Sequence, residues 1–302
     1  MKQAYRDQVA LLVETLPLIA QEACFALKGG TAINLFHRDL PRLSVDIDLA
    51  YVRFEERTTA CANIDAALGR IAKSLIAAGL SAVVQGRGEK KLIVSNRSAS
   101  IKIEPNYTLR GWVFEPSIVG IAKKAEKEFG YAEIAIVSKP ELYGGKICAA
   151  LDRQHPRDLF DIAGLLDSGE TIDHLMDGFV ALLLSHNRPL HELLDPVLKD
   201  QSEVLQKEFT GMTDNAFTYA DHCATFFRLR DFIKSNLVPY WQFLLDFVSL
   251  RTDLSTAPIP NLDRLPAISW KVENLRRLRS ENQGKFDEQY KKLCVLWNAE
   301  HF

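Results

Sequence analysis

The sequence predicts an α/β (α+β) fold in which a first half with a mixed sheet is followed by an all-helical half. Short apolar segments that alternate with polar residues, the pattern of half-buried strands, occur only before residue 139. From residue 140 onward the apolar residues recur at helical spacing instead. The 302 residues, of which 47% are hydrophobic, allow a sizeable core. We therefore expect one domain over residues 1–139 and a helical domain over residues 140–302.

The first half is expected to mix helices with strands. We predict helices over residues 4–20, 31–38 and 57–78, and strands over 23–28, 44–52, 81–85, 90–95, 100–107 and 132–138. The second of these helices follows a Gly-Gly turn, and the hydroxyl of Thr31 is able to cap it. The strands over 90–95 and 100–107 should form a hairpin, because only a short polar stretch separates them.

The second half is expected to contain helices only. Pro140 and Pro156 each begin a helix, since the N–H that proline lacks has no partner at that position anyway. Further helices are predicted over 171–185, 189–208, 214–235, 237–250 and 270–297, with a proline-rich loop over 253–267. The last of these helices has an excess of basic residues, which suits either an RNA backbone or a solvated helix.

Composition excludes several classes of protein. A net charge of -2 provides no overall field to attract nucleic acid, so any basic surface must be local. The five scattered cysteines fit reduced thiols, and no Cys/His cluster indicates a zinc site. The N-terminal segment is interrupted by charged residues, so it is an amphipathic helix and no signal peptide, and no stretch is apolar enough to span a membrane. We expect a cytoplasmic protein without the G-x-S-x-G motif of hydrolases or a P-loop.

The strand "SVDIDLAYV" places two carboxylates on one face. Asp46 and Asp48 alternate with Val45, Ile47 and Leu49, so they lie about 6.5–7 Å apart on the polar side of the strand. Like charges at this distance are costly unless a cation lies between them, and Mg²⁺ commonly takes one or two carboxylates together with substrate phosphates. The motif alone is explained more simply by two solvated acids.

The surrounding residues favour the metal interpretation. Gly29 and Gly30 precede a helix start, whose free N–H groups and dipole suit a phosphate. Glu104 alternates with Ile101 and Ile103 in another strand. If this strand lies beside the strand of the two aspartates, Glu104 would be a third metal ligand. The alternative is that Glu104 is a surface acid at the end of its strand. A phosphate-binding turn beside metal-binding carboxylates is typical of nucleotidyl or phosphoryl transfer.

A second group of charged residues lies in "LYGGKICAALDRQHPRDLFDI". Lys146 and Arg153 are seven residues apart on one helical face, and they suit a triphosphate and a bidentate phosphate contact respectively. The small residues around Lys146 would let a substrate approach the backbone. Arg157 and Asp161 fit an i,i+4 ion pair equally well, and Asp158 fits a helix N-terminus.

These motifs, in this order, resemble a known family. "KGGTAINLF…RLSVDIDL" is similar to the first motif of the polymerase-beta-like nucleotidyltransferase superfamily. Together with "KPELYGGKICAALDRQHPRDLFDI" it resembles the AbiEii/AbiGii toxin nucleotidyltransferases, which include the MenT toxins, over residues 20–165. Two features depart from the pattern: Thr31 stands where serine is usual, and the loop "HRDLPRL" lengthens the gap between Gly30 and Asp46.

The resemblance implies a fold, an activity and partners. The fold would be a polymerase-beta-like nucleotidyltransferase domain followed by a helical domain, with the active site in the cleft between them. The enzyme, of EC 2.7.7 type, would transfer a nucleoside monophosphate from a nucleoside triphosphate (NTP) to an acceptor such as tRNA and release pyrophosphate. Mg²⁺, or Mn²⁺ in its place, would be the cofactor. The protein would be the toxin of a toxin–antitoxin or phage-defence pair, with its antitoxin encoded nearby.

The resemblance also assigns roles to residues. Asp46 and Asp48 would be catalytic metal ligands, with Glu104 as the third ligand. Lys146 would contact the triphosphate, and Asp158 would position Lys146 or act near the acceptor hydroxyl. The residues that would bind the nucleotide are Gly29, Gly30, Thr31, Lys91, Lys146 and Arg153.

Two other classes of function remain open at this point. A protein-modifying or kinase-like transferase would use similar motifs but place its label on protein. A nucleotide-binding antitoxin or sensor without turnover would bind the nucleotide only, although the intact Asp46/Asp48 pair argues against a degenerate site.

Overall fold

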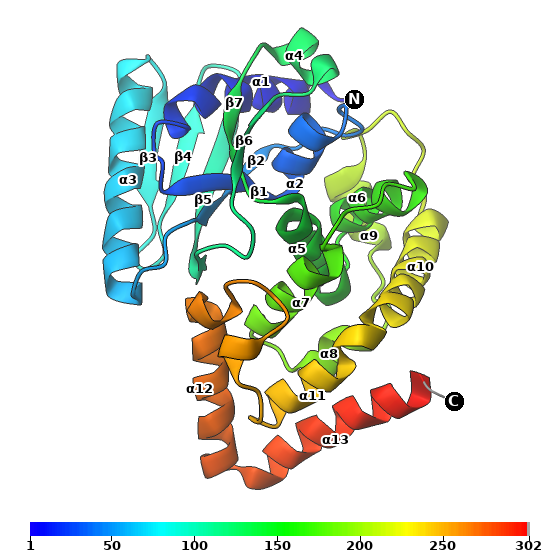
Figure 1. The fold of residues 1–302 in the computed structure, drawn as a ribbon. Coiled ribbons are helices and arrows are strands. Elements are labelled where there is room, and N and C mark those ends of the chain that lie inside the picture. The colour runs from blue at the N-terminus through cyan, green and yellow to red at the C-terminus, as the bar shows by residue number, and fades with distance from the viewer. Residues whose placement is uncertain (301–302) are drawn as a thin grey trace. The chain divides into compact units, whose positions relative to one another are not determined.

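A computed structural model describes the backbone of residues 1–300 and the side chains of residues 1–296. The chain divides into two compact units: Met1–Ser138 with Gln206–Ala216 form the first, and Lys139–Leu205 with the chain from Phe217 onward form the second. All seven strands of the described residues belong to one mixed sheet in the first unit (Figure 1). The predicted α/β (α+β) class is therefore confirmed.

The sheet of the first unit has the strand order β3-β4-β5-β2-β1-β7-β6. Its strands are β1 (Phe25–Lys28), β2 (Asp46–Tyr51), β3 (Ser81–Gln85), β4 (Lys91–Ser95), β5 (Ser100–Arg110), β6 (Ser117–Gly120) and β7 (Glu133–Ile136). β2 runs parallel to β5 and β1 runs parallel to β7, whereas the other neighbouring pairs are antiparallel. The predicted hairpin between β4 and β5 is present.

The first unit also contains helices. They are α1 (Gln3–Ile19), α2 (Gly29–Ala32), α3 (Arg57–Ala77) and α4 (Lys123–Phe129), and a π-helical turn, η1 (Ile33–His37), continues α2. α1 and α3 contact each other and β5, and α3 also lies along β3 and β4 at one edge of the sheet (Figure 1). Ile47 and Leu49 of β2 are completely buried, as expected for the apolar face of an alternating strand.

The sequence-based prediction for Thr31 was wrong. The helix begins two residues earlier, at Gly29, and Lys28 occupies the N-cap position without a side-chain cap. Thr31 lies inside the first turn, and its hydroxyl donates to the backbone carbonyl of Asp46 instead. A tertiary partner thus replaces the local cap that the sequence suggests.

One segment within the predicted helical domain packs with the first unit. The N–H of Leu43 donates to the carbonyl of Met212 (2.7 Å), and the hydroxyl of Thr213 donates to the carbonyl of Pro41 (2.8 Å). Phe209 and Met212 are also buried. These contacts place Gln206–Ala216 in the first unit, which differs from the prediction of one continuous domain over 140–302. They join residues about 170 positions apart, so local pattern carries no trace of them.

The second unit consists of helices. They are α5 (Lys139–Asp152), α6 (Pro156–Asp167), α7 (Leu175–Ser185), α8 (Leu190–Leu194), α9 (Ser202–Val204), α10 (Tyr219–Leu237), α11 (Trp241–Val248), α12 (Pro266–Glu281) and α13 (Gln283–Glu300), with 3₁₀ turns η3 (Val238–Tyr240), η4 (Leu254–Thr256) and η5 (Leu262–Arg264). The π-helical turn η2 (Leu205–Phe209) follows α9 and belongs, from Gln206 onward, to the first unit. The helix predicted over 189–208 is broken, because Pro196 lacks the N–H that a continuing helix needs.

The strand β6 of the first unit was not predicted, since its residues are mostly exposed and show no alternation.

Among the residues that the structure describes, no helix has the length and apolar character needed to cross a membrane.

Candidate functional site

The Gly-Gly turn after β1 lies directly against the acidic strand. Gly29 has φ +76°, a conformation that glycine adopts without steric cost. A Cβ added to Gly29 would lie 2.5 Å from Oδ2 of Asp48, so only glycine leaves room for this carboxylate. The turn and the carboxylate therefore share one small space, as the spacing of the two motifs predicts.

The sheet brings a third acid to the same row. β2 holds Asp46 and Asp48 half-buried on the face opposite Ile47 and Leu49. Because β2 and β5 are parallel neighbours in a register that pairs Asp48 with Glu104, these two side chains lie side by side. Lys91 at the start of β4 follows on the other side of Glu104, with 4.0 Å between Nζ and Oε1.

The carboxylates of this row form an open set of oxygen ligands for a divalent cation. Among the described residues, no group of three or more His, Cys, Asp or Glu side chains converges closely enough to enclose a metal ion. Mg²⁺ does not require such a cage, because it keeps several waters and binds through one or two carboxylates and substrate phosphates. Asp46 and Asp48 on one strand face, with Glu104 beside Asp48, fit this mode of binding.

Thr31 points into the protein. Its side chain is completely buried, its hydroxyl donates to the carbonyl of Asp46 (2.6 Å), and Oγ1 lies 3.0 Å from Oγ of Ser44. The hydroxyl thus holds the helix start to the beginning of β2. Any phosphate contact by Thr31 would come from its backbone N–H, which the first turn of a helix leaves without an intrahelical partner.

Sequence reasoning missed two cationic residues near the turn. Lys28, the last residue of β1, lies directly opposite Asp48 in the antiparallel pair, so both side chains occupy the same face. Arg42, in the loop before β2, is 2% exposed and lies against Gly30. The position of Lys28 directly before the Gly-Gly turn in "KGGT" could have indicated its role. No local pattern shows that an arginine in a polar loop is buried.

The second group of predicted residues forms a buried ion cluster in the second unit. Nζ of Lys146 lies 2.9 Å from Oδ1 of Asp158 and 3.1 Å from Oδ2 of Asp161. Arg153, just beyond the end of α5, donates to Asp158 through Nε (2.6 Å) and Nη2 (3.0 Å). The structure thus brings Lys146, Arg153 and Asp158 together, and it adds Asp161 as a fourth member.

Burial and charge act in opposite directions on Asp158. Burial alone would raise the pKa of this carboxyl, because the charged form loses its hydration. The positive charges of Lys146 and Arg153, with their hydrogen bonds, outweigh burial and hold the pKa of Asp158 well below its usual range. Asp158 is therefore a permanent anion at neutral pH.

The members of this cluster differ strongly in exposure. The side chains of Lys146 and Asp158 are 6% and 1% exposed, whereas that of Arg153 is 62% exposed. Lys146 lies between two anions, so Arg153 is the more accessible of the two cations of the cluster. Asp161 pairs with Lys146 through Oδ2.

The glycines before Lys146 serve helix packing. A Cβ on Gly144 would lie 2.5 Å from the backbone nitrogen of Phe179 in α7, and a Cβ on Gly178 would collide with the carbonyl of Pro140 in α5. The two helices therefore approach each other through a pair of glycines. This corrects the interpretation that small residues at this point make room for a substrate.

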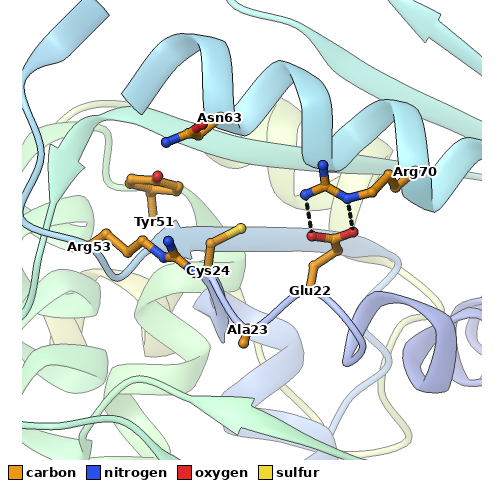
Figure 2. A pocket seen from close by; sticks show the side chains of 7 residues that line it. All are labelled: Glu22, Ala23, Cys24, Tyr51, Arg53, Asn63 and Arg70. Carbon is orange, nitrogen blue, oxygen red and sulfur yellow. Dashed lines mark hydrogen bonds and ion pairs between the residues drawn. The ribbon is translucent and has the colours of Figure 1, made fainter. Parts of the chain in front are cut away.

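A cavity of about 130 Å³ in the first unit contains none of the predicted site residues (Figure 2). It is lined by Glu22, Ala23, Cys24, Tyr51, Arg53, Asn63 and Arg70. Arg70 pairs with Glu22 in a bidentate contact, and burial raises the pKa of the Cys24 thiol, which disfavours the thiolate. Tyr51 is an odd number of residues from Asp48 along β2, so the two side chains lie on opposite faces of the sheet.

Comparison with known proteins shows the family of the chain and a similar fold. A family model described as "Nucleotidyl transferase AbiEii toxin, Type IV TA system" matches residues 10–246. A solved structure of MenT4, a nucleotidyltransferase toxin from Mycobacterium tuberculosis H37Rv, is similar with a TM-score of 0.54 at 18% identity, over 97% of this chain and 93% of that chain. At this identity the likeness concerns the fold. No curated protein matches the chain.

Proposed function

Because this chain belongs to the AbiEii family of nucleotidyl transferase toxins of type IV toxin–antitoxin systems, we propose that it transfers a nucleoside monophosphate from an NTP to tRNA. Pyrophosphate is the leaving group. The observation that carries the proposal is the seating of Gly29 against Oδ2 of Asp48. In this proposal the helix start beside Asp48 binds phosphate, and the neighbouring carboxylates bind a divalent cation.

The residues of the first unit have distinct roles in this proposal. Backbone N–H groups at the start of α2, from Gly29 to Thr31, hold phosphate oxygens of the NTP. Asp46 and Asp48 hold Mg²⁺, for which Mn²⁺ can substitute, and Glu104 beside Asp48 completes the acidic row. When bound, the cation stabilises negative charge that develops on the attacking and leaving oxygens.

Two lysines flank the acidic row. Lys28 lies opposite Asp48, and Lys91 lies 4.0 Å from Glu104. Both ammonium groups are on strands next to the carboxylates, where a compact cation suits the oxygens of a triphosphate. We assign them to nucleotide binding, Lys91 as the sequence suggested and Lys28 as an addition.

The buried cluster of the second unit supports the reaction through Arg153. Lys146 and Asp158 remain assigned to the catalytic machinery, but their burial and mutual pairing favour positioning over direct contact. Asp158 accepts two hydrogen bonds from Arg153 and thereby orients its exposed guanidinium. The bidentate donor geometry of that group suits a phosphate of the nucleotide or of the RNA acceptor.

Radiolabel transfer tests the proposed function. Purified protein incubated with Mg²⁺, each α-labelled NTP in turn and total tRNA should label the RNA. Asp48→Asn removes one negative charge from the row and should reduce labelling about 100-fold or more, since metal stabilisation contributes several kcal/mol to such transition states. Glu133→Gln on β7, an exposed acid of the same sheet, is the matched control and should label like wild type.

Further outcomes separate the competing functions. EDTA should abolish labelling, and added Mg²⁺ or Mn²⁺ should restore it. Label on protein with none on RNA would contradict the tRNA acceptor and support a protein-modifying enzyme. Binding of NTP without transfer to any acceptor would support a sensor module. In cells, the wild type should arrest growth in the absence of its antitoxin, and Asp48→Asn should not.

A further inference from the structure

Arg42 is a buried cation in a polar loop. It lies in the segment that joins η1 to β2, and its side chain is among the largest that are fully buried in the described part of the chain. Arginine is almost never fully buried unless its charge is paired and its donors are satisfied. Its placement in the interior therefore has a specific structural cause.

The guanidinium of Arg42 lies directly under the Gly-Gly turn. A Cβ on Gly30 would be 2.6 Å from Nη2 and 3.6 Å from Cζ of Arg42, so the group is packed against the backbone of Gly30. Nη1 donates to the carbonyl of Leu43 (2.9 Å), which anchors the side chain to its own loop. A Cβ at position 30 would therefore displace the guanidinium of Arg42, just as a Cβ at position 29 would displace the carboxylate of Asp48.

Ser44, two residues further on, supports the same turn. Its Oγ would lie 3.0 Å from a Cβ on Gly30, and it is hydrogen-bonded to the hydroxyl of Thr31. Thr31 in turn donates to the carbonyl of Asp46. The loop before β2 therefore supports the turn from one side, while the carboxylate of Asp48 contacts it from the other.

We infer that Arg42 is a positioning residue, which holds the backbone of Gly29–Thr31 against Asp46 and Asp48. Its five donors lie in a rigid plane, whereas the three donors of a lysine lie on one compact ammonium group at the end of a flexible side chain. It also places a fixed positive charge beneath the segment that receives the triphosphate. This inference rests on the proposed nucleotidyl transfer, and it gives the long loop between Gly30 and Asp46 a function.

A purely structural role for Arg42 makes a different prediction. In that case its replacement would lower the thermal stability of the protein but leave each folded molecule with normal affinity for the NTP. A positioning role requires the affinity itself to change, because the phosphate-binding N–H groups would shift relative to the carboxylates. Displacements of about 1 Å in such sites cost up to about 100-fold in rate.

The test compares Arg42→Lys with Arg110→Lys. Arg110 is a buried arginine of the same unit whose Nη1 also donates to backbone carbonyls, those of Tyr107 and Thr108, so it matches Arg42 in burial and bonding. Steady-state kinetics, direct NTP binding by calorimetry and thermal unfolding are measured for both variants. Arg42→Lys should raise the KM and Kd for the NTP about tenfold or more and lower kcat, with the KM for the acceptor unchanged.

The controls keep this inference separate from the proposed function. Arg110→Lys should lower the unfolding temperature and leave the KM for the NTP unchanged. If Arg42→Lys does not fold, Ser44→Ala decides the question, and it should raise the KM and Kd for the NTP several-fold. Wild-type NTP affinity in the folded variants would overturn the role of Arg42 while the proposed function stands. A wild-type protein that neither binds nor transfers NTP would overturn both.

Discussion

Replacement of Asp158 by asparagine tests whether the ion cluster of the second unit is as tightly coupled as its geometry indicates. The carboxylate accepts a hydrogen bond from Lys146 at 2.9 Å and two from Arg153 at 2.6 and 3.0 Å, and it is 1% exposed. Asparagine has nearly the same shape but turns one accepting oxygen into a donor. That donor would face Lys146 or Arg153, and the cluster would keep two cations with one anion.

The cost of this change can be estimated from the exposure of each partner. Removal of one member of a buried ion pair typically costs about 3–5 kcal/mol. The lost contact with Arg153 contributes little to this cost, because the exposed guanidinium is hydrated once the ion pair is broken. Lys146 keeps Asp161 at 3.1 Å, so we expect the lower end, about 3 kcal/mol. For a domain of this size that corresponds to a decrease of roughly 6–12 °C in Tm.

The assay is urea and thermal unfolding of the wild type, Asp158→Asn and a matched control. The control is Asp167→Asn on the same helix, whose partner Arg228 is half-exposed and whose ion pair should contribute no more than about 1 kcal/mol. A double variant with Lys146→Met and Asp158→Asn should be more stable than the sum of the single effects predicts, because both buried charges of one pair are removed. An Asp158→Asn variant no less stable than Asp167→Asn would refute the reasoning.

The pH dependence of the same pair of proteins provides an independent check. The folded pKa of Asp158 is lowered, so its stabilising contribution is fully present above the unfolded pKa of about 3.9 and is lost as the pH falls through the folded pKa. The difference in unfolding free energy between wild type and Asp158→Asn should therefore be constant above about pH 5 and shrink below about pH 4.

Two further predictions concern glycine and lysine residues. Gly29→Ala should reduce tRNA labelling about 100-fold or more and destabilise the protein. The control is Gly79→Ala, since Gly79 has a similar φ of +88° and a Cβ there would have no atom within 4 Å. This control should lose about 1–2 kcal/mol of stability and label tRNA normally. Equal labelling by the two variants would contradict the contact with Asp48. Lys271 is buried, donates to the carbonyls of His186 and Arg188, and burial lowers its pKa to about 8. Between pH 8 and about 10.5 the unfolded chain therefore binds more protons than the folded chain, so the protein becomes more stable as the pH rises. The difference in unfolding free energy between wild type and Lys271→Met should rise by about 3 kcal/mol across this range. A difference that stays constant would contradict this prediction.

Much of the first unit was predictable from local pattern. Alternation along "SVDIDLAYV" predicted a strand with both aspartates on one face, and the Gly-Gly dipeptide predicted the turn that precedes a helix. Both features depend on residues close together in sequence, where the period of side chains and the φ preferences of glycine act directly. The same holds for most helices of the second half. The exceptions are the helix over 189–208, which Pro196 interrupts, and the helix over 270–297, which is divided at Asn282 into α12 and α13.

Other features depended on contacts that no local pattern records. The pairing of Gln206–Ala216 with the first unit joins segments that are far apart in the chain. The direction of Thr31, the burial of Arg42 and the locking of Lys146 between two aspartates each require a partner from another element. The sequence indicated a helix cap for Thr31 and a phosphate ligand for Lys146. In the fold both side chains bind partners from other elements.

The sequence by itself determined the family-specific motifs, the fold class and the acidic face of β2, because each follows from residues within one turn or one strand. Only the tertiary structure decided which residues touch at the site. Strand order and register put Glu104 beside Asp48 and Lys28 opposite it, and long-range packing put Arg42 beneath Gly30. Residue type and spacing select the chemistry that a chain can offer, whereas register and burial decide which of its groups meet.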